Sequence, residues 1–129
     1  MKIEHIAIWT KDLEKLKNFY IEYFGGITGA KYRNNKKQFE SYYINFESGA
    51  RLELMQMPAI PDNLNNIDEQ YIGLNHIAFS VGCKEAVDNL TERVRNAGFR
   101  VVSDPRCTGD GYYESCVLDP EGNRIEITE

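Results

Sequence analysis

The sequence predicts an α+β protein built from two tandem modules, each with the order strand, helix, strands. The motif His-Ile-Ala occurs twice, at His5 and at His76, and each copy opens a short apolar run. An amphipathic helical pattern follows each run. Each half then closes on a similar strand, with Arg-Leu-Glu-Leu at 51–54 and Arg-Ile-Glu-Ile at 124–127. The same elements therefore recur in the same order.

The first module is predicted to begin with a strand at 5–9 and a helix over 13–24. Apolar residues recur at helical spacing through 13–24. Asp12 is a good N-cap, because its side-chain oxygen can accept a hydrogen bond from a free N–H group of the first turn. Gly25 and Gly26 end the helical pattern. The later strands are predicted at 42–46 and 51–57.

The second module is predicted to repeat this plan. A strand at 77–81 leads to a helix that Gly98 ends, with an apolar stripe of Val87, Leu90, Val94 and Ala97. Further strands are predicted at 99–103, 113–118 and 123–128. One module is too small to be stable alone, so the two are expected to share a core or a continuous sheet in a single domain of residues 1–129. The modules are predicted at 1–57 and 74–129, with a linker at 58–73 that is rich in Pro and Asn at its start.

Composition excludes several classes of protein. The net charge of −5 disfavours nucleic acid as a partner. No apolar run approaches the ~20 residues of a membrane span, so no membrane partner is expected. The first residues lack the apolar core of a signal peptide, and a cytoplasmic location is expected. Cys83, Cys107 and Cys116 are odd in number without CxxC spacing, and we interpret them as reduced thiols.

Four ionisable side chains occupy matching positions in the two halves. Side chains alternate along a strand, so each of these residues lies opposite the aliphatic stripe of its own strand. Two neutral imidazoles and two carboxylates suit a divalent cation and balance its charge. The alternative is that all four are ordinary strand residues on a solvated face. The repeat favours a metal site formed by His5, Glu53, His76 and Glu126.

These motifs resemble the vicinal oxygen chelate superfamily of glyoxalases, bleomycin resistance proteins and extradiol dioxygenases. The resemblance covers nearly the whole chain and rests on the two His-Ile-Ala motifs, Leu-Glu-Leu at 52–54, Gly-Tyr-Tyr at 111–113 and Asp-Pro-Glu-Gly-Asn-Arg-Ile-Glu at 119–126. It implies two βαβββ modules whose mixed sheets curl into a cup, with helices on the outer face and a divalent metal inside. It also implies a further strand in the first module, near 27–32.

The ligand set ranks the members of that family. Glyoxalases commonly use His, Glu, His and Glu. Extradiol dioxygenases use two histidines and one carboxylate around Fe(II), and a fourth ligand at Glu53 disfavours them. In glyoxalases that act on a glutathione adduct, an arginine and an asparagine hold glutathione at the positions of Trp9 and Met57. An apolar pair does not suit the γ-glutamyl carboxylate, so lactoylglutathione lyase activity itself is disfavoured.

The resemblance implies a glyoxalase-like lyase or isomerase that removes a proton from a small vicinal-oxygen substrate with the help of Zn, Ni, Co, Mn or Fe. Glu126 is the expected base and Glu53 its partner. A homodimer is also implied. A non-catalytic drug-binding protein of the same fold and an extradiol-type dioxygenase remain alternatives. The candidate substrate-binding residues are Trp9, Arg51, Met55, Met57, Tyr112, Tyr113 and Arg124.

Overall fold

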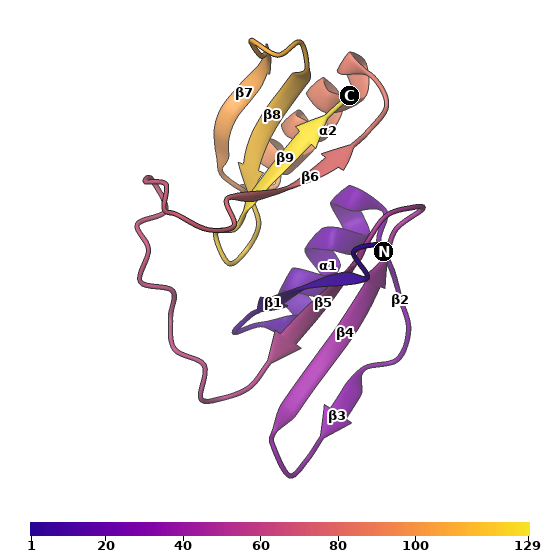
Figure 1. The fold of residues 1–129 in the computed structure, drawn as a ribbon, viewed down its shortest axis with the longest axis vertical. Coiled ribbons are helices and arrows are strands. Elements are labelled where there is room, and N and C mark those ends of the chain that lie inside the picture. The colour runs from indigo at the N-terminus through magenta and orange to yellow at the C-terminus, as the bar shows by residue number, and fades with distance from the viewer. The chain divides into compact units, whose positions relative to one another are not determined.

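A computed structural model describes residues 1–129, which divide by their contacts into two units, 1–63 and 64–129. The first unit contains β1 (His5–Trp9), α1 (Leu13–Phe24), β2 (Ile27–Thr28), β3 (Tyr32–Asn34), β4 (Phe39–Asn45) and β5 (Arg51–Gln56) (Figure 1). Its sheet has the order β1-β5-β4-β2, and β3 also pairs with β4. The last strand of this unit, β5, therefore lies between β1 and β4 in the sheet.

The second unit contains β6 (His76–Ser80), α2 (Lys84–Asn96), β7 (Val101–Cys107), β8 (Tyr113–Leu118) and β9 (Arg124–Thr128). Its sheet has the order β6-β9-β8-β7. In both units the first and last strands pair in parallel, whereas the other pairs are antiparallel. Two mixed sheets with one helix each confirm the predicted α+β class.

The register of the parallel pair is the same in both units. His5 lies beside Arg51 and Ala7 beside Glu53 in the first unit. His76 lies beside Arg124 and Ala78 beside Glu126 in the second. The sequence repeat is therefore also a repeat of backbone pairing.

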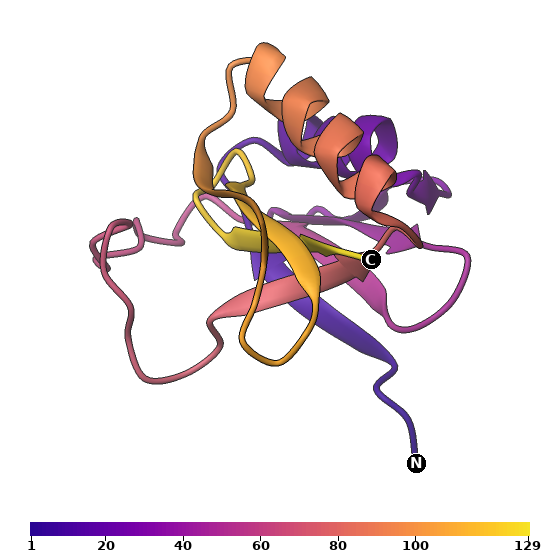
Figure 2. The same cartoon turned by 90° about the horizontal axis from the view of Figure 1, so that it is seen from above.

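Each helix packs on one face of its own sheet (Figure 2). This face carries the aliphatic stripes of the strands, which need cover from water. In the first unit the buried residues are Leu13, Leu16, Phe19, Tyr20, Ile44, Leu52 and Leu54. In the second they are Val87, Leu90, Val94, Val117, Leu118, Ile125 and Ile127. Neither helix is long and apolar enough to cross a membrane.

Three strands differ from the sequence prediction, and the first of these is β4, which starts at Phe39 rather than at 42. The strand expected near 27–32 is replaced by the short strands β2 and β3, because the chain between them, from Gly29 to Lys31, leaves the sheet. The strand expected at 99–103 starts later and extends to Cys107. It passes through Pro105, which is tolerated because β7 is an edge strand and the missing N–H costs no ladder bond there.

Asp12→Ala should lower the free energy of unfolding by about 1 kcal/mol, because an N-cap acceptor is lost. Asp12 Oδ1 accepts a hydrogen bond from the Lys15 N–H at 3.0 Å. Cys83→Ala is the matched control, because Cys83 occupies the N-cap position of α2 but its side chain makes no capping hydrogen bond. Urea unfolding should show a clear loss for Asp12→Ala and almost none for Cys83→Ala. Equal losses would contradict the capping role.

Candidate metal-binding site

The first module brings His5 and Glu53 together on the face that α1 leaves uncovered. His5 Nε2 lies 3.7 Å from Glu53 Oε2. The two residues are on neighbouring parallel strands, and Ala7 stands directly beside Glu53. The methyl side chain of Ala7 adds little bulk to this face beside the carboxylate.

The second module repeats this arrangement. His76 Nε2 lies 3.5 Å from Glu126 Oε2, and Ala78 stands beside Glu126. Both glutamates are partly shielded, with side-chain exposures of 15% for Glu53 and 20% for Glu126. Each module thus places one imidazole nitrogen beside one carboxylate oxygen on its own sheet.

The spacing of these donor atoms suits a metal ion. Two ligands about 2.1 Å from one ion, at ordinary coordination angles, lie about 3.0–3.5 Å apart. The observed separations are close to this and too long for a good hydrogen bond, so Nε2 and the carboxylate do not bond directly to each other in either module. Neither module by itself gathers three or more His, Cys, Asp or Glu side chains that could hold a metal ion.

The second nitrogen of each imidazole is held by the residue that precedes the histidine. His5 Nδ1 contacts the Glu4 carboxylate. His76 Nδ1 lies 3.1 Å from Asn75 Oδ1. In both cases the partner atom is an oxygen acceptor, and the Nε2 atoms are the ones that face the glutamates.

The two glutamates have different neighbours across the sheet. Tyr43 is the cross-strand partner of Glu53, and its ring also meets the His5 ring edge-on at 5.5 Å. Burial, together with the charge of Glu53 and a hydrogen bond to it, raises the pKa of the Tyr43 phenol. A protonated phenol therefore stands beside Glu53 as a donor.

Cys116 takes the place of Tyr43 in the second module. It is the cross-strand partner of Glu126, and burial raises the pKa of its thiol. Burial also raises the pKa of the Glu126 carboxyl, and the nearby His76 lowers it to a smaller extent. The Cys116 thiol is a weak donor and faces the Val117 carbonyl at 3.9 Å, so Glu126 lacks the phenol donor that Glu53 has in Tyr43.

Three of the predicted substrate-binding residues lie at the other end of the first sheet. Trp9 is 39% exposed, pairs in register with Met55, and meets the Phe39 ring edge-on at 6.0 Å. Trp9 and Met55 share the face of His5 and Glu53, by strand alternation. Met57 lies one residue beyond the end of β5 and is half-buried.

The two predicted arginines are already engaged by other groups. Arg51 stacks on the Tyr43 ring, with its guanidinium carbon 4.2 Å from the ring centroid, and pairs with the Glu4 carboxylate. Arg124 donates to the Ile67 carbonyl at 3.1 Å. Both arginines therefore make contacts that hold parts of their own module together.

The tyrosine pair at 112–113 is not brought to the ligand pair. Tyr113 donates to Asp88 of α2 at 2.8 Å, and the Lys84 ammonium lies over its ring, so it belongs to the helix-covered face. Tyr112 is 55% exposed in the loop before β8.

Sequence reasoning missed several neighbours of the candidate ligands and of Trp9. These are Glu4, Phe39, Tyr43, Asn75 and Cys116. The sequence could have indicated Glu4 and Asn75, because each immediately precedes one of the two repeated histidines. The cross-strand neighbours require the pairing register of β4 and β8, which the sequence pattern does not give.

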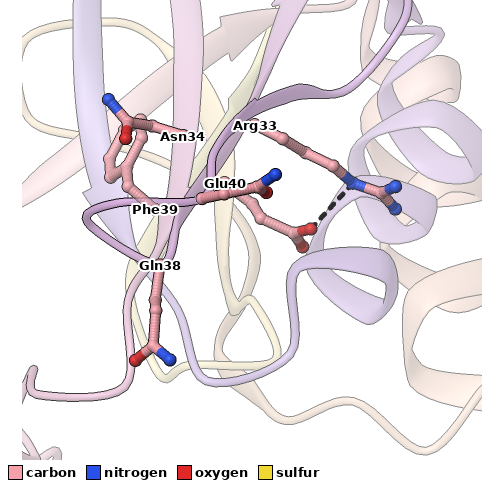
Figure 3. A pocket seen from close by; sticks show the side chains of 6 residues that line it. Arg33, Asn34, Gln38, Phe39 and Glu40 are labelled. Atoms are coloured by element: carbon pink, nitrogen blue, oxygen red, sulfur yellow. Dashed lines mark ion pairs between the residues drawn. The ribbon is translucent and has the colours of Figure 1, made fainter.

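A shallow depression of about 330 Å³ lies at the hairpin of β3 and β4 (Figure 3). Its lining consists of Arg33, Asn34, Asn35, Gln38, Phe39 and Glu40. Arg33 Nε pairs with Glu40 Oε1 at 2.9 Å, which neutralises both charges. None of the predicted ligands lines it, so it is separate from the candidate metal site.

Comparison with known proteins identifies the family. The chain is 28% identical over 130 residues to a Bacillus subtilis protein described as a probable trivalent organoarsenical cleaving enzyme, covering 98% of this chain and 79% of that one. A 37% identical match of 59 residues to an uncharacterised Bacillus subtilis protein covers 43% of this chain and only 46% of the relative.

Among solved structures, a glyoxalase family protein from Enterococcus faecalis superposes with a TM-score of 0.78 at 23% identity, covering 99% of this chain and 97% of that chain. This likeness concerns the fold. Residues 2–127 match the Glyoxalase/Bleomycin resistance protein/Dioxygenase superfamily. The chain therefore belongs to that superfamily.

Proposed function

We propose that the protein is a cytoplasmic, metal-dependent lyase or isomerase of glyoxalase type. Its substrate is a small α-hydroxycarbonyl or hemithioacetal-type compound with two adjacent oxygens. The observation that carries this proposal is the pair of His–Glu contacts, with Nε2–Oε2 separations of 3.7 and 3.5 Å at matched positions of the two modules. Membership of a superfamily rich in such enzymes supports it.

The proposal requires the two half-sites to combine around one divalent ion, Zn, Ni, Co, Mn or Fe. Each module supplies one nitrogen and one oxygen, which is half of a four-ligand set. The halves join either within one chain or between two chains of a homodimer. Either arrangement leaves coordination positions for substrate oxygens.

When bound, the metal ion supplies Lewis-acid polarisation of a carbonyl group. In this proposal Glu126 takes the proton from the adjacent carbon, because no strong donor holds its carboxylate. Glu53 stays in place, because the Tyr43 phenol donates to it. The aromatic rings of Trp9 and Phe39, on the same face, would contact an apolar part of the substrate.

A second candidate is cleavage of a trivalent organoarsenical, which the name of the 28% identical relative favours. Cys83 and Cys107 are free and exposed, and soft thiolates bind soft metals and metalloids. A trivalent aryl arsenical therefore belongs in the substrate panel. A non-catalytic drug-binding role predicts ligand binding without turnover of any member of that panel.

Elemental analysis of the untagged protein tests the central proposal. The wild type should hold about one divalent ion per site after loading with Zn, Ni or Mn, and a His5→Ala/His76→Ala variant should hold none, because half of the donors are lost. Absence of metal from the loaded wild type would contradict the enzyme proposal. Equal metal in the variant would place the ion elsewhere.

A further inference from the structure

We propose that Glu4 and Asn75 are positioning residues that select the imidazole tautomer able to bind a metal, and that Glu4 makes the first module the stronger half of the site. Only the second part, the stronger metal binding of the first module, rests on the proposed function. The tautomer selection is a property of the metal-free protein.

The first step is the chemistry of the contact atoms. An ionised carboxylate and an amide oxygen can only accept hydrogen bonds. The Nδ1 atoms of His5 and His76, which contact Glu4 and Asn75 Oδ1, must therefore carry the proton. A neutral imidazole protonated on Nδ1 has its lone pair on Nε2. In both modules Nε2 faces the glutamate of the candidate site.

The second step is how Glu4 is held. It precedes β1, so its side chain is free of the strict alternation of the strand. Its carbonyl accepts the Arg51 N–H at 3.0 Å, and its carboxylate pairs with the Arg51 guanidinium. Arg51 in turn stacks on Tyr43, whose ring meets His5. These contacts form a closed cycle of four side chains, of which the His5 imidazole is one.

The third step is the difference between the modules. Asn75 gives His76 a neutral partner, and its amide nitrogen donates to Gln70 at 3.1 Å. A carboxylate partner increases the donor strength of an imidazole more than an amide does, because it stabilises positive charge on the ring. His5 should therefore bind the ion more strongly than His76, so that the first module anchors it.

The test uses the fact that the chain has only two histidines. Long-range ¹H–¹⁵N spectra of the metal-free protein at a pH of about 8.5 report the two tautomers directly, and His76→Gln assigns them. Both rings should be protonated on Nδ1 in the wild type. Glu4→Ala should shift only His5 away from this tautomer, and Asn75→Ala only His76. Glu85→Ala, on the exposed first turn of α2, is the control and should change neither.

Charge is separated from hydrogen bonding by two nearly isosteric variants. Glu4→Gln keeps an acceptor oxygen, so the tautomer should persist while metal affinity in a chelator competition falls. Asn75→Asp should raise the affinity. Glu4→Ala should lower the metal affinity about 10–100-fold, which is the usual loss when the hydrogen-bond partner of a ligating histidine is removed.

An unchanged His5 spectrum in Glu4→Ala would overturn the tautomer assignment. Equal affinities of wild type and Glu4→Gln would overturn the anchoring role. If Glu4→Ala fails to fold, Glu4→Gln and Asn75→Asp still decide that role. A wild type that binds no metal would overturn the proposed function and the anchoring role, while the spectra of the metal-free protein still decide the tautomer.

Discussion

Glu126→Gln is expected to lower kcat by about 10²–10⁴-fold, the usual contribution of a positioned general base. An amide cannot take the substrate proton, but its oxygen can remain near the ion. Metal content should therefore change little. The physical reason lies in the surroundings, since Glu126 has Cys116 as its cross-strand partner and no strong donor beside it.

Glu53→Gln is the matched comparison, because Glu53 occupies the same position of the repeat. Its carboxylate is held by Tyr43, so its loss should weaken metal binding more than it lowers kcat at saturating metal. The measurement combines kcat on α-ketoaldehyde–thiol adducts and small α-hydroxycarbonyls with metal affinity. The opposite pattern, with turnover lost mainly in Glu53→Gln, would exchange the roles of the two glutamates.

Leu54→Ala is expected to lower the free energy of unfolding by about 2–5 kcal/mol. Leu54 is 0% exposed, in the central strand β5 beneath α1. Truncation removes apolar contact and leaves a cavity that the surrounding sheet cannot fill. Typical domains are stable by only about 5–15 kcal/mol, so the loss is a large share of the total.

Urea unfolding followed by circular dichroism measures this effect. Leu64→Ala is the matched control. It makes the same chemical change, but Leu64 is 96% exposed, so its truncation leaves no cavity. It should alter the midpoint very little. A comparable loss in both variants would show that Leu54 is not part of a close-packed core.

The sequence repeat predicts which histidine and glutamate lie together in each module, for a physical reason. Strand alternation places His5 and Glu53 on the face opposite the aliphatic stripe, and the structure brings them together there. The helix over 13–24 and its Asp12 cap are confirmed at the predicted positions. Periodicity and capping are local signals that need no knowledge of tertiary packing.

The cross-strand neighbours needed information that is not local. Residues 42 and 43 are both tyrosines, so the pattern does not say which of them faces the ligands. A shift of one residue would exchange the two faces. The observed register places Tyr43 opposite Glu53 and Tyr42 opposite Leu54.

The face on which Tyr113 lies could have been predicted from the sequence. It lies two and four positions before the buried residues Ser115 and Val117, so alternation already places it on the helix face. The position of the tyrosine pair after the flexible Asp110-Gly111 turn suggests substrate binding, but the period of the strand assigns Tyr113 to packing against α2.

The central positions of β5 and β9 set the order in which the protein can fold during synthesis. β1 and β6 have no partner in their own sheets until strands that begin about 46 and 48 residues later have been made. Both histidine strands must wait as the ribosome continues, while each helix and antiparallel hairpin can form from nearby residues. The two His–Glu pairs should therefore be the last features of each module to assemble, and under the proposed function a nascent chain should gain its full metal affinity only after β9 has left the exit tunnel.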